Sequence, residues 1–110
     1  MLNADQVRAF MTGRTLCAFD PADGSQVARV TYGADGRAHV LHPDGATDEG
    51  DWGLVGNTYW TRYDKMRDGT RNSFHLEQVT QDVVQAWFAD GRRAMIQTPL
   101  EELPPGLTDE

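Results

Sequence analysis

Between Thr15 and Thr98 the sequence alternates apolar and polar residues with a period of two, and short turn motifs interrupt the alternation repeatedly. In three turns an Asp-Gly pair, which tolerates the positive φ angles of a tight hairpin, comes just before a new extended run: Asp35-Gly36, Asp68-Gly69 and Asp90-Gly91. The pattern predicts eight strands: Thr15–Phe19, Gln26–Tyr32, Arg37–Leu41, Asp51–Leu54, Thr58–Met66, Asn72–Thr80, Val83–Phe88 and Arg92–Thr98. Turns this short leave no room for crossover helices, so the strands should form an antiparallel meander.

One short helix is predicted ahead of the strands, over Asn3–Thr12, with Asn3 as its N-cap and Gly13 at its end. Its apolar residues fall on one stripe: Val7, Phe10 and Met11. A helix of this length is marginal alone in water, so it must dock on the sheet. A meander hides its edges by closing into a small barrel or by curling into a strongly curved sheet. We predict a mainly β fold, a closed or nearly closed barrel with the helix over one end.

The chain of 110 residues is expected to be a single domain over residues 1–100, because two domains of about 55 residues would each have a marginal core. Pro104 and Pro105 cannot pair in a sheet, and the last ten residues contain four acidic and no basic residues. We therefore expect residues 101–110 to form an acidic disordered tail.

The net charge of the chain bears on which classes of partner it can bind. Seventeen acidic and ten basic residues give a net charge of −7, which argues against nucleic acid and against anionic membranes. No segment approaches the roughly 18 apolar residues of a membrane span, so no membrane insertion is expected. The N-terminus lacks the pattern of a secretory signal, which predicts a cytoplasmic protein, or a periplasmic one if a signal peptide has been removed.

Three segments carry a resemblance to a known group of proteins. They are a Gly-x-Trp strand with a Gly-Asn turn and a Trp-x-Arg strand over residues 50–63, a hairpin over Val84–Arg92, and Gly13-Arg14-Thr15-Leu16. Together they resemble small bacterial lipocalin-like (calycin) domains of unknown function, loosely over residues 13–98. The resemblance implies a lipocalin-like barrel with an interior pocket and supplies no catalytic residues. Members of that group are exported and carry paired cysteines, whereas this chain has the single Cys17.

No arrangement of residues predicts catalysis, a metal or a cofactor. The three histidines, His39, His42 and His75, are interpreted as surface or hydrogen-bonded residues, since zinc needs three or four converging ligands. Cys17 lies within a predicted strand and is interpreted as a buried apolar residue. The acidic residues between Asp44 and Asp51 lack the spacing of a calcium loop, which favours a solvated acidic loop.

The central strand combines aromatic and charged side chains. One face would carry Trp60, Arg62, Asp64 and Met66, and the other Tyr59, Thr61, Tyr63 and Lys65. If the first face points inward, its arginine needs a buried partner, and the neighbouring strands offer Glu77, Gln78, Gln85 and Trp87. We predict a ligand site formed by Trp60, Arg62, Trp87 and Glu77. The alternative is that Arg62 pairs with Asp64 or Glu77 on the outer surface.

The predicted function is non-enzymatic binding of a small, partly apolar ligand by a lipocalin-like barrel. An alternative is an interaction protein that acts as a homodimer, because a meander that fails to close leaves an edge strand to pair with its copy. An enzyme is the third hypothesis and has the least support, because turn geometry alone explains most of the aspartates.

Overall fold

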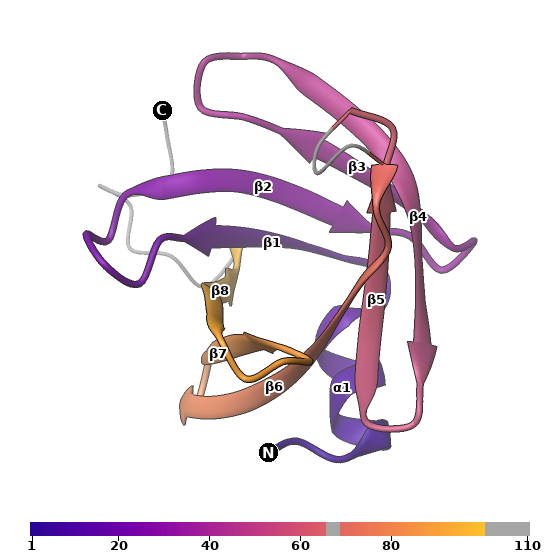
Figure 1. The fold of residues 1–110 in the computed structure, drawn as a ribbon, viewed down its shortest axis with the longest axis vertical. Coiled ribbons are helices and arrows are strands. Elements are labelled where there is room, and N and C mark those ends of the chain that lie inside the picture. Colours follow the sequence, from indigo (N-terminus) through magenta and orange to yellow (C-terminus); the bar gives the residue numbers. More distant parts are fainter. Residues whose placement is uncertain (66–68, 101–110) are drawn as a thin grey trace.

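The chain forms a closed eight-stranded antiparallel barrel with one short helix, as predicted (Figure 1). The computed structural model describes residues 1–65 and 69–100. The elements are α1 (Ala4–Met11), β1 (Arg14–Phe19), β2 (Gln26–Tyr32), β3 (Arg37–Leu41), β4 (Thr47–Val55), β5 (Thr58–Tyr63), β6 (Asn72–Thr80), β7 (Val83–Phe88) and β8 (Arg93–Pro99). Each strand pairs with the next, and β1 pairs with β8, for example Cys17 with Thr98. Because β1 pairs with β8, neither strand is left as the open sheet edge on which the homodimer prediction depended. The homodimer itself stays a prediction.

The β4 strand begins four residues earlier than predicted, at Thr47 instead of Asp51. The prediction of a solvated acidic loop is therefore wrong for Asp48, Glu49 and Asp51, which lie within this strand. The carboxylate of Asp48 is buried and accepts hydrogen bonds from the backbone N–H groups of Glu49 and Lys65. The end of the predicted strand at Met66, the turn at 67–68 and the tail at 101–110 lie outside the described residues.

Aspartates hold most of the turns between the strands. In four turns, five aspartate side chains each accept a hydrogen bond from the backbone N–H two residues later. The pairs are Asp20 with Ala22, Asp23 with Ser25, Asp35 with Arg37, Asp44 with Ala46 and Asp90 with Arg92. Gly36 and Gly91 then take positive φ angles of 87° and 94°, which L side chains rarely adopt. These carboxylates thus have a structural role as turn formers.

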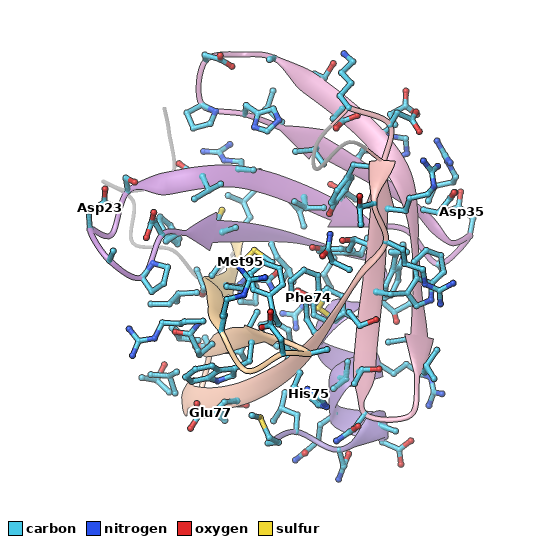
Figure 2. All side chains as sticks on the ribbon, in the orientation of Figure 1. Asp23, Asp35, Phe74, His75, Glu77 and Met95 are labelled. Atoms are coloured by element: carbon cyan, nitrogen blue, oxygen red, sulfur yellow. The ribbon has the colours of Figure 1, made fainter. Side chains whose placement is uncertain are left out.

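Aromatic side chains fill the interior of the barrel. Tyr32 packs edge-on against Trp52 at 5.3 Å and against Tyr59 at 6.0 Å between ring centroids. Tyr59 in turn stacks on Phe74 at 5.0 Å. Figure 2 shows Phe74 in the middle of the molecule, enclosed by the strands. The interior is therefore a packed core, as expected for a barrel of this size.

The helix covers one end of this core. Its N-cap Asn3 and Gln6 form a reciprocal capping box, and Val7 and Met11 on its inner face are fully buried. The segments on both sides of the helix are tied to strands, because Leu2 N–H donates to Leu76 and Gly13 N–H donates to Tyr32. Within the described residues, no helix has the length and apolar character needed to cross a membrane.

Candidate functional site

All four predicted ligand residues lie on the outer surface of the barrel. On β5 the buried residues are Tyr59, Thr61 and Tyr63, so Trp60 and Arg62 alternate outward. On β6 and β7 the core residues Leu76 and Ala86 point inward, and their neighbours Glu77 and Trp87 point outward. Figure 2 shows Glu77 directed away from the interior.

Arg62 belongs to a row of charges across three strands. Its guanidinium donates to Asp51 at 2.9 Å and to Asp64 at 3.2 Å. Asp51 also accepts a hydrogen bond from Arg37 at 2.6 Å, so one carboxylate joins two arginines. The pairing with Asp64 is the arrangement that the alternative interpretation of Arg62 expected. The pKa of Asp51 is lowered by these hydrogen bonds, most by the one from Arg62 and next by the one from Arg37.

Trp87 and Glu77 form a second, separate pair. The indole Nε1–H of Trp87 donates to Glu77 Oε1 at 2.9 Å. Within residues 1–65 and 69–100, no hydrogen bond, ion pair or ring contact joins this pair to Trp60 or Arg62. Of the four predicted residues, the structure therefore pairs Glu77 with Trp87, whereas Trp60 contacts Arg71 and Arg62 contacts Asp51 and Asp64.

The interior contains one polar pair that the sequence did not single out. The side-chain amide of Gln97 donates to the hydroxyl oxygen of Tyr59 at 2.7 Å, and both residues are almost completely buried. Nearby on β5, the buried hydroxyl of Thr61 has no hydrogen-bond partner among the described residues. No pattern along a single strand reveals such a pair, because the two residues are 38 positions apart.

A hollow of about 500 Å³ lies on the outer wall formed by the first four strands. We call it the outer groove. It is lined by Thr15, Arg29, Thr31, His39, Val40, Leu41, Thr47, Asp48, Glu49 and Leu100. Three further hollows on the described surface have volumes of about 310, 270 and 240 Å³. Small-molecule sites typically occupy 300–1,000 Å³, so the outer groove has the size of a ligand site.

The strand register arranges the groove in two rows of side chains. The first row runs through directly opposed residues: Thr15, Thr31, His39 and Glu49. The hydroxyls of Thr15 and Thr31 share a hydrogen bond of 2.8 Å, and His39 Nδ1 lies 3.6 Å from Glu49 Oε1. This row is polar along its whole length.

The second row is more apolar. It runs through Cys17, Arg29, Leu41 and Thr47. Leu41 is 44% exposed, although it lies within a strand. Burial raises the pKa of the Cys17 thiol, and the neighbouring Arg29 guanidinium acts in the opposite direction. Cys17 is fully buried, so the exposed chemistry of this row comes from an aliphatic and a guanidinium side chain.

The described residues contain no group of three or more histidine, cysteine, aspartate or glutamate side chains that could hold a metal ion. Comparisons with family models, with curated proteins and with solved structures found no match to this chain.

Proposed function

We propose that this protein binds a small, partly apolar molecule without catalysing a reaction, and that the ligand lies in the outer groove. The observation that carries the proposal is the groove itself, where the exposed Leu41 and the half-buried Leu100 adjoin hydroxyl, imidazole, guanidinium and carboxylate groups. Such a combination of an apolar wall with a few polar groups is typical of small-molecule sites. We further propose a relationship to lipocalin-like domains, which the eight-stranded barrel with its short helix supports.

The packing of the interior favours an external site. Tyr32, Tyr59 and Phe74 are fully buried and the Tyr59 ring contacts both of the others, so a ligand inside would have to displace aromatic rings. A ligand in the outer groove displaces only water. The guanidinium of Arg29 can form charge-assisted hydrogen bonds with an anionic end of the ligand, beside the carboxylates of Asp48 and Glu49 that also line the groove.

The test is a titration of the full chain with 8-anilinonaphthalene-1-sulfonate, which has an apolar body and one sulfonate. We expect saturable binding to one site. Leu41→Asp should weaken this binding by about tenfold, because it places a carboxylate where the apolar body lies. Val55→Asp is the matched control. Val55 is also an exposed aliphatic residue at the end of a strand, 60% exposed, but it lies outside the groove.

This dye also binds partly unfolded proteins, so near-ultraviolet circular dichroism of each variant must match that of the parent. Equal affinities of the two variants would show that the dye does not use the outer groove, and the proposed site would be wrong. Linear, non-saturating fluorescence of the parent protein would have the same meaning.

A further inference from the structure

Three arginines on the wall formed by the later strands lie against aromatic rings. The guanidinium of Arg71 lies 4.0 Å from the centroid of the Trp60 ring. Arg92 lies 4.6 Å from the Phe88 ring, and Arg93 lies 5.9 Å from the Trp87 ring. Stacking on a ring occupies the face of a guanidinium and leaves its N–H groups at the edge able to donate.

Two of these arginines border a hollow of about 310 Å³ that is distinct from the outer groove. Its other polar lining residues are Asn72, Ser73 and Asp90. The turn that carries Arg92 is fixed beside β6, because the backbone N–H of Ala89 donates to the carbonyl oxygen of Ser73. The cations and the hydrogen-bonding side chains therefore face one hollow from two separate segments.

The charges in this hollow are not balanced within the part of the chain that the structure describes. Asp90 accepts from the backbone N–H of Arg92 with one oxygen and from its Nε with the other, at 3.0 and 2.7 Å. These hydrogen bonds to Arg92 lower the pKa of Asp90 and keep it ionised. Arg71 has no carboxylate within 4.0 Å among residues 1–65 and 69–100. Two cations and one anion thus leave an excess positive charge, although the whole chain has a net charge of −7.

We propose that the hollow between Arg71 and Arg92 binds the phosphate group of a small phosphate monoester. Two guanidinium groups, the Ser73 hydroxyl and the Asn72 amide supply donors from several directions, which suits the three oxygens of a phosphoryl group better than the two of a carboxylate. The Asn72 Nδ2 also donates one hydrogen bond to the carbonyl oxygen of Thr70 at 3.3 Å, and its second N–H can donate to the phosphate. The hollow is far larger than the phosphate group needs, so part of the organic body enters beside Phe88. This site stands on residues that the outer groove does not use, and the two proposals can fail independently.

The experiment is isothermal titration calorimetry of the full chain with phenyl phosphate and, separately, with benzoate, in a phosphate-free buffer of low ionic strength. We expect phenyl phosphate to bind more tightly than benzoate, with an affinity that falls as salt is added. Benzoate binding that equals or exceeds phenyl phosphate binding would overturn the assignment to a phosphate monoester.

Arg71→Gln is the decisive variant, because it keeps a polar side chain that can donate hydrogen bonds and removes its charge. Its affinity for phenyl phosphate should fall about tenfold or more, the expected effect of losing a charge-assisted hydrogen bond. Arg93→Gln removes the same charge from the same wall but lies outside the hollow, so it should change the affinity by less than about threefold. Equal losses in both variants, or none in Arg71→Gln, would show that general charge attraction or another surface accounts for binding.

The outer-groove variant Leu41→Asp serves as a second control and should bind phenyl phosphate like the parent. Loss of phenyl phosphate binding in a natively folded Leu41→Asp protein would place the anion in the outer groove and contradict a separate site. Near-ultraviolet circular dichroism again confirms that each variant is folded before its affinity is compared.

Discussion

Arg62 lies directly opposite Asp51 on the neighbouring strand, and its Nη2 donates to Asp51 Oδ2 at 2.9 Å. Arg37 lies opposite Asp51 on the other side and donates to Oδ1 at 2.6 Å. One aspartate therefore links β3, β4 and β5 through both of its oxygens. These three side chains are all more than a third exposed, so their ion pairs make only a small contribution to the free energy of unfolding.

Replacement of Asp51 by asparagine should make stability less sensitive to acid. The pKa of Asp51 is lowered by its hydrogen bonds, so its contribution is fully present above the ordinary aspartate pKa of about 3.9. The contribution is lost as the pH falls through the lower pKa of the folded state. Urea midpoints of the parent and of Asp51→Asn should therefore differ at pH 7 and converge toward pH 2.

Arg62→Gln provides the comparison, because it removes the largest single cause of the lowered pKa while Arg37 still donates to Asp51. We expect an intermediate pH dependence for this variant. If the urea midpoints of the parent and of Asp51→Asn differed by the same amount at every pH, the carboxylate would not stabilise the protein through its ionisation.

Two glycines on β4 should respond differently to alanine. A Cβ on Gly50 would overlap the backbone carbonyl oxygen of Arg62, which the strand pairing holds in place. Gly50→Ala should destabilise the protein by about 3 kcal/mol or more, because overpacking here cannot be relieved by a side chain. Thermal unfolding monitored by circular dichroism measures the effect.

Gly53→Ala is the matched comparison, because its Cβ would lie 2.6 Å from the Nε1 atom of the outward-facing Trp60. The indole can move outward, so we expect a smaller destabilisation of about 1 kcal/mol. The displaced ring should also disturb the cation–π contact with Arg71 and weaken phenyl phosphate binding. Equal destabilisation by the two substitutions would contradict this account of the two glycines.

The buried hydrogen bond between Gln97 and Tyr59 should contribute measurably to stability. Tyr59→Phe removes the acceptor of the Gln97 amide and should cost about 1–3 kcal/mol in urea unfolding. Thr61→Val is the control, since the buried Thr61 hydroxyl makes no hydrogen bond within the described residues, and this change should be neutral or stabilising. A larger loss in Thr61→Val than in Tyr59→Phe would contradict both assignments.

The helix should behave as part of the core. Met11 is fully buried in the same cluster as the aromatic side chains of the barrel, so Met11→Ala should cost about 2–4 kcal/mol. Arg8→Ala changes an exposed residue of the same helix and should have little effect. The two unfolding curves can be compared directly, and similar midpoints would show that the helix does not seal the interior.

The strands could be predicted because local signals specify them. Aspartate-containing turns and the two-residue alternation place the ends of β2, β3, β6 and β7 as the structure has them. The start of β4 was missed because Thr47-Asp48-Glu49-Gly50 contains no apolar residue to mark the inner face. Its inward position is filled by Asp48, whose burial depends on the backbone N–H of Lys65, seventeen residues away.

The orientation of β5 could not be predicted from its own composition. Both of its faces combine aromatic and polar residues, so alternation alone does not show which one lies inside. The structure resolves this through partners on other strands, since Tyr59 meets Gln97 and Phe74 while Arg62 meets Asp51. The outer groove depends in the same way on the register of four strands, which no single segment encodes.

Intermolecular nuclear Overhauser effects between bound 8-anilinonaphthalene-1-sulfonate and the protein show directly whether the ligand binds outside the filled barrel. We expect effects from the dye to the methyl groups of Leu41 and Leu100, which line the outer groove. Effects to the ring protons of Tyr59 and Phe74, both fully buried in the interior, would contradict this expectation.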